Sequence, residues 1–128
     1  MLSGFKPVNL IIGLPYVSIT ANGVTFNKPC IIKLGKPTHV LLMINDETKQ
    51  IAIQVCDQED DNATPFLRSE AKSTLSVRWN NKDFLNQLSK MMNWDLNESG
   101  YKVNGEYLND ENAMIFDLNS ATVLGEKD

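Results

Sequence analysis

The feature of this sequence that most constrains its fold is an almost unbroken apolar run, His39-Val-Leu-Leu-Met-Ile-Asn45. Successive side chains of a β-strand point to opposite faces, so the run places apolar groups on both faces. Such a pattern is typical of a strand that is covered on both sides. We therefore expect two apolar layers around this segment, supplied either by a second chain or by the rest of the same chain.

The composition limits the class of protein. The chain has 128 residues, of which 42% are hydrophobic and 22% are charged. This is enough for one domain or two very small ones, and it excludes a fully disordered or fibrous chain. No apolar run approaches the ~20 residues of a membrane span, and we expect no secretory signal peptide. With only Cys30 and Cys56 as thiols, we expect a soluble cytoplasmic protein without a disulfide framework.

Charge is unevenly distributed along the chain. Residues 1–55 have a net charge of +3 and residues 56–128 have −7, which together give the −4 of the whole chain. This asymmetry predicts a basic module joined to an acidic one. The alternative interpretation is a chance distribution of surface charge.

An acidic stretch marks the expected boundary. Asp57-Gln-Glu-Asp-Asp-Asn-Ala-Thr-Pro65 lacks large apolar residues and ends in proline, so we predict a solvated linker or loop over 57–72. The carboxylates do not have the spacing of an EF-hand calcium loop. The predicted organisation is a module at 1–56, this linker, and a second module at 73–128.

Both modules are predicted to combine strands with one helix, which gives an α+β fold. In the first, Asn22-Gly23 predicts a tight hairpin turn. In the second, an apolar stripe predicts a helix capped by Asn80 or Asn81. The predicted elements are strands at Tyr16–Thr20, Val24–Phe26, His39–Asn45, Gln50–Val55, Ser73–Trp79, Tyr101–Tyr107 and Ala113–Leu118, and helices at Pro29–Leu34 and Lys82–Asn93.

Residues ~16–55 resemble the AbrB-like swapped-hairpin domain. The resemblance rests on the strand Val24-Thr-Phe26, on a short helix with Lys28 and Lys33 that ends in Leu34-Gly35, and on the two strands that follow. It implies a homodimer in which hairpins of two chains interleave, and a role as a transcriptional regulator or an antitoxin. About forty residues alone bury too little apolar surface, which agrees with such an exchange. The alternative is a monomer in which the second half of the chain supplies the missing cover.

Duplex DNA is the partner that this resemblance predicts. Lysines at 6, 28, 33 and 36 are the candidate phosphate contacts, and Asn22 and Asn27 are candidates for hydrogen bonds to phosphates or base edges. The full set is Lys6, Asn22, Asn27, Lys28, Lys33 and Lys36. Arginine is absent from residues 1–55, so we expect weak sequence specificity. The alternative is that these are solvated surface lysines.

The second half suggests another class of function. Its acidic residues and aromatic anchors could bind a basic partner protein, as an inhibitor from a phage or another mobile element would. The candidate residues are Asp57, Glu59, Asp60, Asp61, Trp79 and Trp94. The alternative interpretation is that both tryptophans belong to the hydrophobic core.

We expect no enzymatic activity. His39 is the only histidine and begins an apolar strand, while Cys30 stands among apolar residues, where a cysteine is usually a small buried hydrophobe. No phosphate-binding loop, metal-binding motif or cofactor-binding motif is present. The expectation is a binding protein with no metal and no cofactor.

Overall fold

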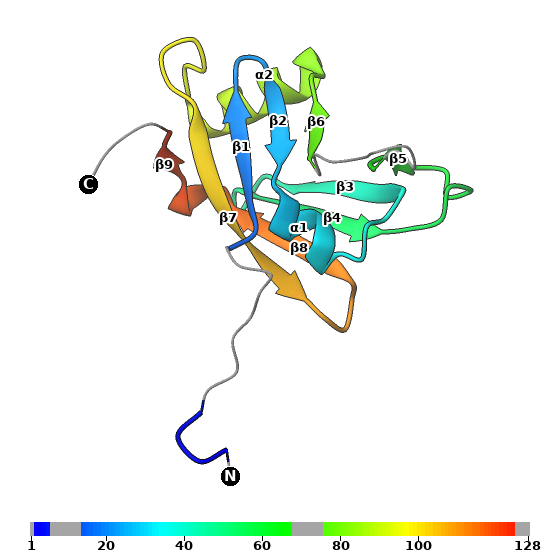
Figure 1. The fold of residues 1–128 in the computed structure, drawn as a ribbon. Helices are drawn as coiled ribbons and strands as arrows, with labels where there is room; N and C mark the ends of the chain where they lie inside the picture. Colours follow the sequence, from blue (N-terminus) through cyan, green and yellow to red (C-terminus); the bar gives the residue numbers. More distant parts are fainter. Residues whose placement is uncertain (1, 6–13, 68–75, 125–128) are drawn as a thin grey trace.

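The computed structural model of the chain describes residues 2–5, 14–67 and 76–124, most of which lie in or between antiparallel strands (Figure 1). Two α-helices and one short 3₁₀-helix accompany these strands. The elements in chain order are β1 (Tyr16–Thr20), β2 (Gly23–Phe26), α1 (Lys28–Lys33), β3 (His39–Asn45), β4 (Gln50–Val55), β5 (Thr64–Pro65), β6 (Val77–Trp79), α2 (Lys82–Met92), β7 (Tyr101–Leu108), β8 (Ala113–Asp117), η1 (Leu118–Ser120) and β9 (Thr122–Val123).

The described strands form one sheet in the order β5-β3-β4-β8-β7-β1-β2-β6, with β9 paired to β7. The sheet curls into a half-barrel, and α2 is the only described helix of seven residues or more. The predicted α+β class is therefore wrong, because helix accounts for only 19% and the fold is mostly β.

The reason for this difference is the position of the last hairpin. Strands β7 and β8 do not form a layer of their own but lie between β1 and β4. Val17 faces Val103 across the β1–β7 pair, and Ile53 faces Met114 across the β4–β8 pair. Residues 76–124 thus supply, within the same chain, strand partners and apolar cover for the early strands.

The apolar run of β3 is covered on one face only. Val40 is fully buried, and Leu42 and Ile44 pack against the core. Met43 points to the outer face and stays 42% exposed. The expectation of cover on both faces is wrong for this outer side, since the sheet is a single layer there.

The β1–β2 turn also differs from the prediction. Thr20 pairs with Gly23, so the two turn residues are Ala21 and Asn22. Gly23 has φ +150°, and a Cβ there would lie 2.7 Å from the carbonyl oxygen of Trp79. The glycine is therefore required for the close approach of β6 to β2 rather than as a turn residue.

Both predicted helices are confirmed, and their ends follow from local chemistry. Asn81 caps α2 by accepting a hydrogen bond from the Phe84 amide at 3.0 Å, and Asn93 ends the helix in the left-handed conformation. Gly35, with φ +85°, follows α1 and terminates it. The predicted strands are confirmed to within one residue at each end in most cases. Part of the strand predicted at 73–79 lies outside the described residues.

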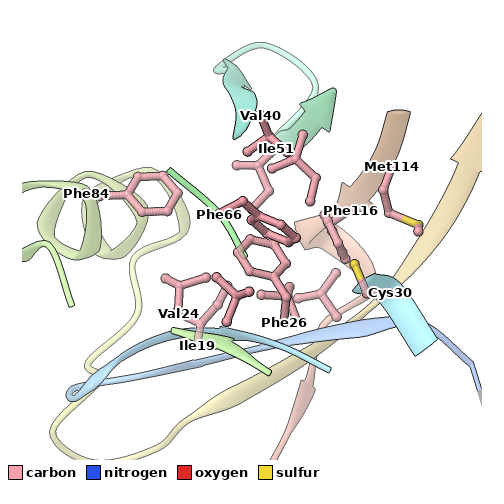
Figure 2. Packing of buried hydrophobic residues seen from close by; sticks show 14 of the residues in the cluster. Ile19, Val24, Phe26, Cys30, Val40, Ile51, Phe66, Phe84, Met114 and Phe116 are labelled. Carbon is pink, nitrogen blue, oxygen red and sulfur yellow. The ribbon is translucent and has the colours of Figure 1, made fainter. Parts of the chain in front are cut away.

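Aromatic side chains from both halves of the chain meet inside the curl of the sheet (Figure 2). The ring of Phe26 lies 5.3 Å from that of Phe66, 5.0 Å from that of Trp79 and 5.8 Å from that of Phe116. These tilted and edge-to-face contacts are the arrangements that aromatic rings prefer. Phe26 belongs to β2 and Phe116 to β8, so the cluster joins residues that are distant in sequence.

The shared sheet predicts that residues 1–56 cannot fold alone. In that fragment β1 lacks β7, β4 lacks β8, and the ring of Phe26 loses its aromatic neighbours. We expect the fragment to show no cooperative unfolding transition by circular dichroism and to be digested by protease much faster than the full chain. Mixing it with a 57–128 fragment is the complementary control. A cooperative transition of the 1–56 fragment alone would contradict the shared core.

Candidate nucleic-acid interface

A row of polar side chains crosses the outer face of the sheet. Strand register aligns Lys102 of β7 with Ser18 of β1, Ser18 with Thr25 of β2, and Thr25 with Arg78 of β6. Their neighbours in sequence, including Val17, Val24 and Val103, are buried on the inner face, so this row faces outward. Three inter-strand spacings separate the backbone positions of Lys102 and Arg78 by roughly 14 Å.

Contacts along the sheet hold both cations in place. The Lys102 ammonium lies 4.4 Å from the centre of the Tyr16 ring, a cation–π distance. The Arg78 Nε donates a hydrogen bond to the Thr25 hydroxyl at 3.3 Å. Both side chains are thereby directed along the face of the sheet, which lowers the entropy lost on binding a ligand.

The lysines of α1 begin beside this row. The backbone N–H of Asn27 donates to the Tyr16 carbonyl at 3.1 Å, which places the next residue, Lys28, near the start of β1. Lys28, Lys33 and Lys36 are all exposed. We define the basic face as Tyr16, Ser18, Thr25, Lys28, Arg78 and Lys102. Residues 14–45, which supply four of these six, contain no aspartate or glutamate.

The residues predicted to contact DNA are only partly brought together. Lys28, Lys33 and Lys36 share α1 and the turn after it, whereas Asn22 lies at the opposite end of the β1–β2 hairpin. Lys33 lies 5.4 Å from the Tyr107 ring centre. Lys6 lies outside the described residues.

Asn27 has a structural role. Its Oδ1 accepts hydrogen bonds from the Tyr16 amide at 3.0 Å and the Cys30 amide at 3.1 Å, and its Nδ2 donates to the Leu14 carbonyl at 3.0 Å. The side chain caps α1 and fixes the entry to β1, so its hydrogen-bonding groups are engaged within the protein.

Six of the acidic residues lie in two adjacent segments at another corner of the molecule. Gln54 Nε2 donates to the Glu111 carbonyl at 3.0 Å, so the β7–β8 turn lies against the end of β4, where the acidic loop begins. We call the carboxylates of these two segments the acidic corner: Asp57, Glu59, Asp60, Asp61, Asp110 and Glu111. Within residues 14–67 and 76–124, no three His, Cys, Asp or Glu side chains form a group suited to a metal ion.

The two tryptophans have different surroundings. Trp79 packs in the aromatic cluster, and its Nε1 donates to the Pro65 carbonyl at 3.2 Å. Trp94 is half-buried and stacks on Tyr101, with ring centres 4.1 Å apart and planes at 10°. Trp79 therefore belongs largely to the core, while Trp94 keeps part of its surface open.

The thiols and the histidine do not form a nucleophilic site. Burial raises the pKa of Cys30 to about 12, whereas an activated thiol needs a lowered pKa. His39 Nδ1 is hydrogen-bonded to the Thr38 hydroxyl at 3.0 Å. Cys56 lies at the acidic corner, and its pKa is raised by desolvation and by the nearby carboxylates of Asp60 and Asp57.

The sequence did not single out five residues of this candidate face: Tyr16, Ser18, Thr25, Arg78 and Lys102. The β1–β2 hairpin aligns Ser18 with Thr25, but Lys102 and Arg78 join the row only through the β1–β7 and β2–β6 pairings, which no local pattern encodes. The absence of acidic residues over 14–45 is visible in the sequence, and this segment supplies four residues of the basic face.

Comparisons of the chain with protein-family models, curated proteins and solved structures gave no significant match. The resemblance to AbrB-like domains therefore stays a prediction. None of the helices in the described part of the chain combines the length and apolar character needed to cross a membrane.

Replacing Asn27 should affect stability. Asn27→Ala removes the helix cap and leaves the Tyr16 amide without its side-chain acceptor, so we expect unfolding free energy to fall by about 2 kcal/mol in a urea titration. Asn22→Ala is the matched control, because Asn22 is an exposed turn residue, and its effect should stay within about 0.5 kcal/mol. Equal stability of the two variants would contradict the role given to Asn27.

The thiols should respond to pH and reagents in different ways. Cys30 stays neutral in the folded chain up to about pH 12, but ionises near its ordinary value of 9.0 when unfolded. Its contribution to stability is therefore complete below pH 9 and declines between pH 9 and 12. At pH 8 we expect Ellman's reagent to label only Cys56 in the native protein and both thiols in urea. Labelling of native Cys56→Ser would contradict the burial of Cys30.

Proposed function

We propose that the protein is a small, non-catalytic DNA-binding protein of the regulator or antitoxin-like kind, which contacts the phosphodiester backbone through its basic face and the α1 lysines. The observation that carries this proposal is the outward row Lys102–Ser18–Thr25–Arg78. It offers two cations with two hydroxyl groups between them. Cationic, hydroxyl and amide donors of this kind supply most phosphate contacts in protein–DNA complexes.

Charge separation supports the same proposal. The whole chain carries −4, but the acidic corner is built from the β4–β5 loop and the β7–β8 turn, away from the outward row on β7, β1, β2 and β6. A DNA strand can then lie on the basic face without meeting those carboxylates. The strands that carry the two cations are three inter-strand spacings apart, roughly 14 Å at the backbone, which is comparable to the width of the major groove, about 12 Å.

Sequence readout at this face is expected to be weak. Arg78 is the only arginine of the face, and its Nε already donates to Thr25. A bidentate contact from arginine to guanine is the most frequent specific contact in the major groove. Affinity would therefore come mainly from backbone contacts, with a marked dependence on salt.

A second function rests on the acidic corner. Six carboxylates on two adjacent loops provide a surface for a basic protein, as the inhibitor hypothesis requires. This function needs the acidic corner and not the basic face, so variants of the two surfaces separate the hypotheses.

Binding to a labelled duplex should be measured by fluorescence anisotropy at several salt concentrations. With Lys28, Lys33, Lys36, Arg78 and Lys102 on phosphates, the slope of log affinity against log salt should be about −4.5. The double variant Arg78→Glu/Lys102→Glu should lose at least about tenfold in affinity at low salt. The control, Lys49→Glu/Lys90→Glu, changes the net charge equally at two sites outside the basic face and should bind nearly as the wild type.

Equal losses in the two double variants would mean that binding follows net charge alone and would overturn the assignment to this face. No binding of duplex by the wild type at low salt would overturn the proposed function. Binding of a cationic protein that is lost on replacing Asp57 and Asp60 by asparagine would then favour the second function.

A further inference from the structure

A groove at the far end of the β1–β2 hairpin is separate from the basic face and has a volume of about 420 Å³. One side of α2 forms its floor, where Lys82, Leu85, Asn86 and Ser89 follow the helical spacing of three or four residues. The β1–β2 turn and the turn after α2 form its walls, and α2 lies beside the upper ends of β1 and β2 in Figure 1. We call this the α2 groove; its lining residues outside α2 are Ala21, Trp94, Asp95, Leu96 and Asn97.

Trp94 provides a rigid aromatic surface in this groove. The Asn93 residue at the end of α2 is left-handed, and the Trp94 amide donates to the Ser89 carbonyl at 2.9 Å, which fixes the backbone. Tyr101 covers one face of the indole by parallel stacking at 4.1 Å and does not line the groove. Trp94 is half-buried against the core and still lines the groove, so its indole is held in place at the groove wall.

Polar groups surround this aromatic surface. Asn86 and Asn97 bring two carboxamides, each with donors and an acceptor, and Ser89 brings a hydroxyl group. The backbone N–H of Asn97 donates to Asp95 Oδ1 at 3.0 Å, and this hydrogen bond fixes the turn that carries both residues. Lys82, at the first residue of α2, adds one ammonium group to the lining.

We propose that the α2 groove binds a mononucleotide, with the base stacked on Trp94, its edge hydrogen-bonded by the carboxamides of Asn86 and Asn97, and its phosphate paired with Lys82. Bases stack on aromatic side chains irrespective of sequence, and asparagine is a common partner of the adenine edge. The groove volume falls within the usual range of small-ligand sites. The lining has one cation, Lys82, and one carboxylate, Asp95, so it has no net charge to attract a polyanionic strand, and stacking and hydrogen bonds to the base would supply most of the affinity.

This inference does not depend on DNA binding, because no residue of the α2 groove belongs to the basic face. Nucleotide binding in the α2 groove and DNA binding at the basic face can each fail independently. A chain that binds duplex but no mononucleotide would refute the groove alone, and the converse result would refute the basic face alone.

The test is isothermal titration of the full chain with AMP, GMP, CMP and UMP, and with adenosine. We expect at least one nucleotide to bind, and Trp94→Leu to weaken binding about ten- to hundredfold. Lys82→Gln should weaken binding of AMP but leave adenosine unchanged, because adenosine has no phosphate. Lys90→Gln, on the same helix but outside the groove, is the matched control and should change neither.

Trp94 also packs on Tyr101, so its replacement could disturb folding. Asn86→Ala provides a second variant at an exposed helix position, and it should reduce nucleotide affinity severalfold with an unchanged circular dichroism spectrum. Three results would overturn the proposal: no binding of any nucleotide at millimolar concentration, binding that survives both Trp94→Leu and Asn86→Ala, or equal binding of methyl glucoside, which would identify a saccharide site instead.

Discussion

The contacts of the Phe26 ring with Phe66, Trp79 and Phe116 hold this fold together. Each aromatic pair adds about 0.5–1.5 kcal/mol beyond the burial of its surface. Their larger effect is geometric. Phe26 precedes the acidic loop and the other three rings follow it, so the cluster brings both halves of the chain into one core. The cluster lies inside the curl of the sheet and includes Trp79 of β6, which pairs with Val24 of β2 beside the basic face.

Local elements could be predicted from the sequence because their signals are local. The Asn27 cap and Gly35 bound α1 within a few residues, and the apolar stripe of α2 lies within three turns. Alternation identified β4, with Ile51 and Ile53 on the buried face. These signals depend on neighbours along the chain, so they hold whatever the tertiary structure.

The arrangement of the strands could not be predicted in the same way. The sequence of the β7–β8 hairpin is equally compatible with a separate module and with a shared sheet. Only its pairing with β1 and β4 places it in the middle of the sheet. The candidate site shares this limit. Lys102 and Arg78 lie in the half of the chain whose net charge is −7, so the summed charge of that half does not indicate a basic site. The net charge of residues 1–55 is positive, and this range supplies most of the basic face. Arg78 and Lys102, however, belong to residues 56–128, whose summed charge is negative.

The order of strands in the sheet has a consequence for synthesis on the ribosome. Strand β1 is complete at Thr20, yet its partner β7 begins only at Tyr101. At about 5–20 residues per second, roughly 4–16 seconds pass before that partner has been made. During this interval β1 and β4 expose unpaired backbone edges and apolar side chains to other nascent chains. The sheet can close only when the C-terminal hairpin has been synthesised, so these edges stay unpaired for most of translation.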